Sequence, residues 1–205
     1  MSHSTLMIER QQIWFKREDL NTTGSIKDRG ISHQLNTHLN KNEKSLVISS
    51  SGNAAISASY YAKLANAKMY VFIYPDCNPE KKNRLNELGA TIMESTQPLT
   101  ESLEFAERNG FTHIRQATDP EATVGYQELA AEIVDQLGLE KIDINDLALF
   151  IPVSSGTAFV GLFEGFSSLI KAKKLEKYPQ MHAVQSQAVH PIAGPFDTMF
   201  KRKST

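Results

Sequence analysis

Short apolar segments alternate along the sequence with segments of helical periodicity, and this alternation limits the fold more than any other feature. The segments typical of buried strands are residues 46–49, 69–73, 91–93, 112–114, 147–153 and 183–185. Helical patterns occupy residues 54–66, 79–88, 100–109, 126–137 and 158–173. Strands that alternate with helices form mostly parallel sheets with helices on both faces. We therefore expect an α/β protein built from three-layer αβα domains.

Several helix ends are marked by residues with a known preference for such positions. Asn78 precedes Pro79 and Glu80, an order typical of a helix start. Glycine commonly follows the last turn of a helix, so Gly89 and Gly110 are expected to end helices. Gly138 is expected to end the helix at 126–137 in the same way.

Composition excludes several classes of protein. Charged residues make up 22% of the 205 residues and the formal net charge is -1, which argues against a nucleic-acid-binding protein. Apolar runs are too short for a membrane-spanning helix, and the N-terminus lacks the layout of a signal peptide. The single cysteine, Cys77, cannot form an internal disulfide. We expect a cytoplasmic protein that binds neither nucleic acid nor membranes.

Two short loops rich in serine follow two of the expected strands, and each opens an expected helix. They are Ser50-Ser51-Gly52-Asn53 and Ser154-Ser155-Gly156-Thr157. In α/β proteins ligands bind beyond the carboxyl ends of the strands. Backbone N–H groups at a helix start attract anions, hydroxyls add donors, and glycine permits close approach. Each loop alone is also compatible with an ordinary helix cap, but together they indicate a ligand set with two anionic ends.

A third segment, residues 22–30 with the sequence TTGSIKDRG, places Lys27 where a turn meets an expected helix. The positive end of a helix dipole disfavours the ammonium form and lowers the pKa of a lysine. A lysine with a lowered pKa can form a Schiff base with an aldehyde. Pyridoxal 5′-phosphate is an aldehyde with a phosphate, and its amino-acid substrates carry a carboxylate, so one lysine and two anion loops suit this cofactor. The histidines show no metal-ligand spacing, so no metal site is expected.

These three segments, in this order, resemble the fold-type II pyridoxal-phosphate family, that of the tryptophan synthase β chain, cysteine synthase, threonine dehydratase and threonine synthase. In that family a stretch similar to residues 14–21 leads into the motif P-T-G-S-x-K-D-R. The resemblance implies that Lys27 holds the cofactor, that Asn53 hydrogen-bonds its 3′-oxygen, and that the loop at 154–157 binds its phosphate. It also implies that the loop at 50–53 holds the substrate carboxylate. The residues so assigned are Lys27, Ser50, Ser51, Gly52, Asn53, Ser154, Ser155, Gly156 and Thr157.

Within the family the sequence looks most similar to threonine synthases. That resemblance implies a lyase that converts O-phosphohomoserine to threonine with release of phosphate, Lys27 being the general base. The leaving phosphate requires a further cationic pocket, for which Lys16, Arg17 and Arg29 are candidates. Threonine dehydratase, cysteine synthase and a truncated, non-catalytic relative that needs a partner chain remain alternatives.

The sequence also departs from the family pattern. Thr22 stands where the family has proline, and the phosphate loop has only Gly156 and Gly161. Family members continue well beyond this length, so the resemblance implies an incomplete large domain, without the residue that faces the pyridine nitrogen. It divides the chain into a large cofactor domain (1–39 and 119–205) and a small inserted α/β domain (40–118). Relatives commonly dimerise, so the chain is a candidate homodimer.

Overall fold

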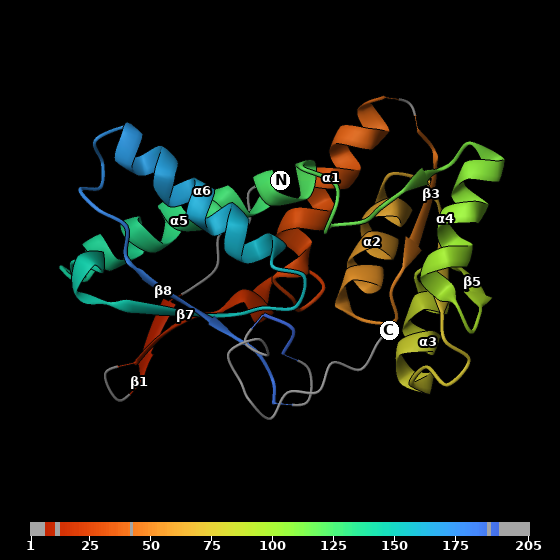
Figure 1. Ribbon diagram of the computed structural model, residues 1–205, viewed down its shortest axis with the longest axis horizontal. Coiled ribbons are helices and arrows are strands. Elements are labelled where there is room, and N and C mark those ends of the chain that lie inside the picture. Colours follow the sequence, from red (N-terminus) through yellow and green to blue (C-terminus); the bar gives the residue numbers. More distant parts are fainter. Residues whose placement is uncertain (1–6, 11–12, 42, 188–189, 193–205) are drawn as a thin grey trace.

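The computed structural model describes residues 7–10, 13–41, 43–187 and 190–192, which form an α/β fold with three sheets (Figure 1). The strands are β1 (Met7–Arg10), β2 (Ile13–Lys16), β3 (Ser45–Ser49), β4 (Lys68–Ile73), β5 (Thr91–Glu94), β6 (Thr112–His113), β7 (Ala148–Pro152) and β8 (Gln180–Val184). The α-helices are α1 (Lys27–Asn40), α2 (Asn53–Leu64), α3 (Pro79–Glu87), α4 (Pro98–Asn109), α5 (Glu121–Leu139) and α6 (Thr157–Lys171). Single 3-10 turns occupy Glu18–Leu20 and Ile144–Asp146.

The four-stranded sheet has the order β5-β4-β3-β6, and its strands are all parallel. Side chains of a strand alternate between its faces, and β3 shows this clearly. Leu46 and Ile48 pack with α1 and α2, whereas Val47 packs against Ala106 of α4 on the other face. Figure 1 shows β3 between α2 and α4. This sheet is therefore the middle layer of an αβα arrangement, as the sequence predicts.

A second parallel sheet pairs β7 with β8 and packs one face against α5 and α6. Ile151 of β7 is 8% exposed and lies in this core, while its neighbour Phe150 is 68% exposed. Phe150 stacks on His182 of β8, with ring centroids 4.8 Å apart. Among the described residues, helices cover only one face of this sheet, which is consistent with the partial domain that the sequence predicts. The remaining pair, β1 and β2, is antiparallel.

Three glycines let α1, α5 and α6 pack almost backbone to backbone. A Cβ on Gly125 of α5 would lie 2.3 Å from the carbonyl oxygen of Arg29. A Cβ on Gly161 of α6 would lie 2.3 Å from the carbonyl oxygen of Thr123, and one on Gly165 would lie 2.4 Å from that of Gln127. No side chain fits at these distances, so glycine sets the spacing of the three helices.

The predicted helix ends are confirmed in part. Asn78 accepts hydrogen bonds from the N–H groups of Glu80 and Lys81 at 2.9 and 3.3 Å, and so caps α3. Gly89 and Gly110 follow α3 and α4 with φ angles of +78° and +64°, which favour glycine. Gly138 does not end α5, which continues to Leu139.

The predicted α/β class with parallel sheets is correct, but several boundaries differ. Helix α5 begins at Glu121 instead of residue 126. Pro120 directly precedes it, and the fixed φ of proline suits a helix start. The final strand lies at Gln180–Val184 instead of 183–185, and the hairpin of β1 and β2 was not predicted. The division into a large and a small domain stays a prediction. No helix in the described part of the chain combines the length and apolar character that crossing a membrane requires.

Candidate active site

Lys27 is the first residue of α1 and is half-buried. Burial lowers the pKa of its amine, because the charged form loses contact with water. Among the described residues no carboxylate forms an ion pair with this amine. The structure therefore supports the expected direction of the pKa shift, with burial as its physical cause. A buried amine of this kind is more often neutral, and therefore nucleophilic, than an exposed lysine.

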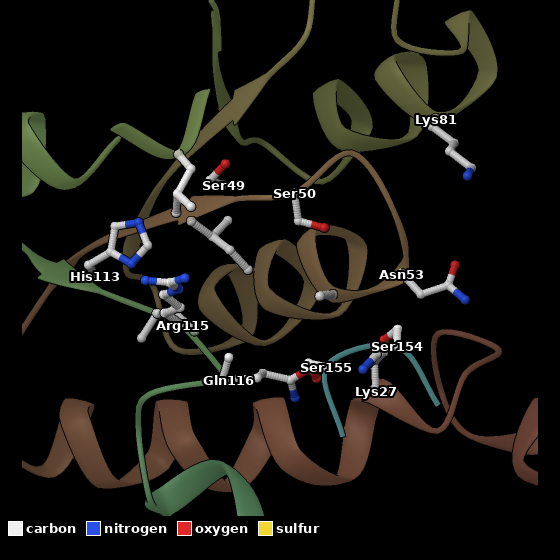
Figure 2. Close-up of a pocket in the computed structure, with 15 residues that line it drawn as sticks. Lys27, Ser49, Ser50, Asn53, Lys81, His113, Arg115, Gln116, Ser154 and Ser155 are labelled. Carbon is white, nitrogen blue, oxygen red and sulfur yellow. The ribbon is translucent and has the colours of Figure 1, made fainter. Parts of the chain in front are cut away.

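Two cavities of about 510 and 470 Å³ share Lys27, Asn53, Ser154 and Ser155 in their linings. Lys27 comes from α1, Asn53 opens α2, and the two serines follow β7. Figure 2 shows Lys27 and Ser154 close together, with Asn53 and Ser155 on either side. The three sequence segments therefore meet at one place, at the carboxyl ends of β3 and β7, where α/β folds bind ligands.

The first serine loop contributes only part of its predicted set. Ser50 lines the larger cavity, and its Oγ accepts a hydrogen bond of 3.2 Å from the N–H of Gly52. Asn53 is exposed and lines both cavities. Among the described residues its side chain has no hydrogen-bond partner, so it is available to a ligand. Ser51 and Gly52 line neither cavity.

The second serine loop leads into α6 and presents the start of that helix to the smaller cavity. Gly156 caps α6 with a φ of +85°, and an added Cβ there would meet no atom within 4 Å. Ser154, Ser155 and Gly156 line the cavity. Backbone N–H groups at such a helix start, with two hydroxyls beside them, suit a phosphate group.

Thr157 has a different environment from the rest of its loop. It is 5% exposed and lines neither cavity. Its Oγ1 donates to the carbonyl oxygen of Gln116 at 3.2 Å and lies 2.9 Å from the Oγ of Ser155. The hydroxyl therefore joins α6 to the segment after β6 and holds Ser155 in place.

Several cavity-lining residues were not predicted as site residues from the sequence. Lys81, His113, Arg115 and Gln116 line the larger cavity (Figure 2). His113, Arg115 and Gln116 lie at or just beyond the carboxyl end of β6, and that position is the signal that could have found them. Neither cavity has a carboxylate among its described lining residues, so both favour anionic ligands.

The cations expected to receive a leaving phosphate lie elsewhere. Arg29 is 1% exposed and binds Glu18 and Glu132 through its guanidinium at 2.7 to 2.9 Å. Lys16 binds Glu132 at 2.7 Å, and Arg17 binds Asp19 at 2.7 Å. None of these three cations lines either cavity around Lys27, so that expectation is wrong. The pairs of Arg29 and Lys16 with Glu132 hold α1 and β2 against α5, whereas the pair of Arg17 with Asp19 is local.

The half-buried amine of Lys27 and the start of α6 face a common cavity, and this arrangement suits a cofactor that carries an aldehyde and a phosphate. The family described as pyridoxal-phosphate dependent enzyme matches residues 5–205, and the chain belongs to it. Its fold is the tryptophan synthase β-like fold of type II enzymes, and its cofactor is pyridoxal 5′-phosphate. The residues present fit this group, because they supply an amine for its aldehyde and hydroxyl and backbone donors for its phosphate.

Individual relatives are similar over about half of their own length. The catabolic L-threonine dehydratase TdcB of Staphylococcus aureus (strain USA300) is 28% identical over 207 residues, which cover 97% of this chain and 54% of that protein. The solved structure of an O-ureido-L-serine synthase gives a TM-score of 0.74 at 18% identity and covers 88% of this chain and 59% of its own. The processed threonine deaminase isoform 2 of Solanum lycopersicum gives 0.71 at 23%, with coverages of 84% and 46%. At such identities the structures show a shared fold alone.

Proposed function

We propose that this chain carries the cofactor site of a pyridoxal-phosphate dependent lyase with an activity similar to that of threonine dehydratase. The observation that carries the proposal is the position of Lys27, whose buried amine lies where the two cavities meet. The similarity to the S. aureus L-threonine dehydratase supports the choice of reaction. This similarity favours the dehydratase alternative over threonine synthase, to which the sequence motifs were expected to be most similar.

The residues around Lys27 form two groups. One suits the cofactor phosphate, and the other suits the substrate carboxylate or the ring oxygen of the cofactor. Ser154, Ser155 and the first N–H groups of α6 would hold the cofactor phosphate. Ser50 and Asn53, at the start of α2, would bind the substrate carboxylate or the cofactor's ring oxygen. The predicted roles of Ser51, Gly52 and Thr157 stay predictions, since none of the three lines a cavity.

Lys27 would have two tasks in this reaction. It would hold the cofactor covalently, and after the substrate amine replaces it, its Nζ would take the proton from the substrate Cα. The bound cofactor would supply an electron sink for the pair left on that carbon. A half-buried amine with a lowered pKa is suited to this work, because a larger share of it is neutral near pH 7. Half-burial also limits the water that reaches it.

Threonine synthase remains a second candidate because of Lys81 and Arg115. Both side chains line the larger cavity beside Ser50, and among the described residues neither forms an ion pair. A substrate with a phosphate leaving group needs cations in such a place. If this candidate is correct, Lys81→Ala and Arg115→Ala will impair turnover of O-phosphohomoserine and leave turnover of threonine much less affected.

Product analysis distinguishes the candidates. The purified chain, supplied with pyridoxal 5′-phosphate, is incubated with threonine, with O-phosphohomoserine, or with O-acetylserine and sulfide. A 2-oxo acid and ammonia from threonine support the dehydratase, threonine and phosphate support threonine synthase, and cysteine supports cysteine synthase. Lys27→Ala is the control for reaction of the free cofactor. Cofactor binding without turnover of any of these substrates contradicts all three activities for this chain alone.

A further inference from the structure

Asp28, the residue after Lys27, is a completely buried carboxylate with three donors around it. Its Oδ2 accepts from the backbone N–H of Thr23 at 2.6 Å, and its Oδ1 accepts from the Oγ1 of Thr23 at 2.5 Å. The same Oδ1 accepts from the Oγ of Ser57, also completely buried, at 2.7 Å. These hydrogen bonds compensate the carboxylate for the water that it loses on burial.

The three bonds connect parts of the chain that contribute to the active site. Thr23 lies in the turn that leads to Lys27, and Ser57 lies one helical turn after Asn53 on α2. The rest of the contact between α1 and α2 is largely apolar, with Ile31 and Leu35 of α1 in one core with small residues of α2. Apolar contacts are not directional, so a short charged hydrogen bond constrains the relative position of two helices more tightly.

We infer that Asp28 is a positioning residue, which acts through Ser57 to hold the start of α2 at a fixed place relative to Lys27. The inference rests on the proposed cofactor roles of Lys27 and Asn53. Without the bond from Ser57, the two walls of the shared cavity are joined less tightly, and the cofactor must be ordered at greater cost on binding. Asp28 itself lines neither cavity, so it acts through its neighbours.

The test uses Ser57→Ala, which removes one bond and leaves both bonds from Thr23. The matched control is Ser59→Ala, because Ser59 is on the same helix, is 1% exposed, and has a buried Oγ without a partner in the described structure. Both variants lose one buried hydroxyl, so a general effect of that loss appears in both. We expect Ser57→Ala to weaken cofactor affinity by about tenfold, as for loss of a hydrogen bond to a charged group, and Ser59→Ala to leave it near that of the wild type.

Hydrogen exchange of the cofactor-free chain provides a second readout. In Ser57→Ala we expect amides of residues 23–28 and 53–57 to exchange about tenfold faster than in Ser59→Ala, because these segments lose their common link. Equal cofactor affinity in the two variants, or unchanged exchange in these segments, overturns the inference. A wild type that binds no cofactor at Lys27 contradicts the proposed function instead, and the exchange experiment then still decides whether Asp28 and Ser57 join the two segments.

Discussion

Lys27 and Asn53, the first residues of α1 and α2, line the same two cavities although they belong to different helices. The positive end of each helix dipole therefore lies at the same place. Anionic groups are favoured there, and the ammonium form of a buried amine is disfavoured. Two helix starts that meet beside a lysine explain how one site can suit a phosphate, a carboxylate and a reactive amine.

Replacing Lys27 tests the proposed covalent attachment directly. Lys27→Ala removes the amine, so we expect the visible absorbance band of the attached cofactor to disappear and turnover to fall by about 10²–10⁴-fold or more. Reduction with borohydride followed by peptide mass spectrometry should place the cofactor on Lys27 in the wild type. A modified lysine elsewhere, or a band that survives in Lys27→Ala, would contradict the assignment.

Gly156→Ala tests the role of the α6 start in holding phosphate. The residue has a φ of +85°, so alanine should lower the free energy of unfolding by about 1–2 kcal/mol. Gly89→Ala is a matched control, since Gly89 has a φ of +78°, and neither glycine has an atom within 4 Å of an added Cβ. We expect similar losses of stability from urea denaturation but weaker cofactor binding only in Gly156→Ala. Equal affinities in the two variants would count against a phosphate site at α6.

The ion pairs of Arg29 predict a large effect on stability. Arg29→Met leaves Glu18 and Glu132 without their guanidinium partner, and breaking a buried pair in this way should cost about 3–5 kcal/mol of unfolding free energy. Arg17→Ala, which removes an exposed pair with Asp19, should change the unfolding free energy far less, because solvent screens an exposed pair. Urea denaturation of both variants measures the difference. Similar values for the two would show that the buried network contributes little.

His113 predicts a pH dependence of stability. Burial, and then the charge of Arg115, lowers the pKa of His113 to about 4, below the ordinary value of 6.5. Between these two pH values the unfolded chain therefore binds more protons than the folded chain. The contribution of His113 to the free energy of unfolding is complete above pH 6.5 and falls as the pH decreases toward 4. The loss from this group is less than about 3 kcal/mol, because the partly exposed ring keeps some contact with solvent. In His113→Gln the unfolding free energy should vary less between pH 6.5 and pH 4 than in the wild type. The same pH dependence in both proteins would show that His113 is not its cause.

The position of the candidate site could be predicted because it depends on local features. Lys27 and the two serine loops each stand where a turn meets a helix, and the carboxyl ends of parallel strands are where α/β folds bind ligands. The larger cavity also needs Lys81 and Arg115, which reach it only because α3 follows β4 and because β6 pairs with β3. Strand order is a long-range property that spacing along one sequence does not reveal.

Other site predictions were wrong because the same residue type can serve either a ligand or the packing of the fold. Gly161 looked like part of a phosphate loop, but in the structure it lies within α6 against the carbonyl oxygen of Thr123. Lys16 and Arg29 looked available to a leaving group, but both bind Glu132. A sequence shows which residues carry charge or lack a side chain, whereas their partners depend on which helices pack together.

The close packing at Gly125, Gly161 and Gly165 has a consequence for engineering this chain. Replacing a helical glycine with alanine ordinarily raises stability by about 1 kcal/mol, so a library designed on helix propensity would include all three positions. Here each methyl group would force neighbouring backbones apart. Because α6 begins directly after the second serine loop, such a shift would change the position of that loop relative to Lys27. Substitutions that touch no ligand could therefore abolish cofactor binding, and a selection for stability alone would not reveal why.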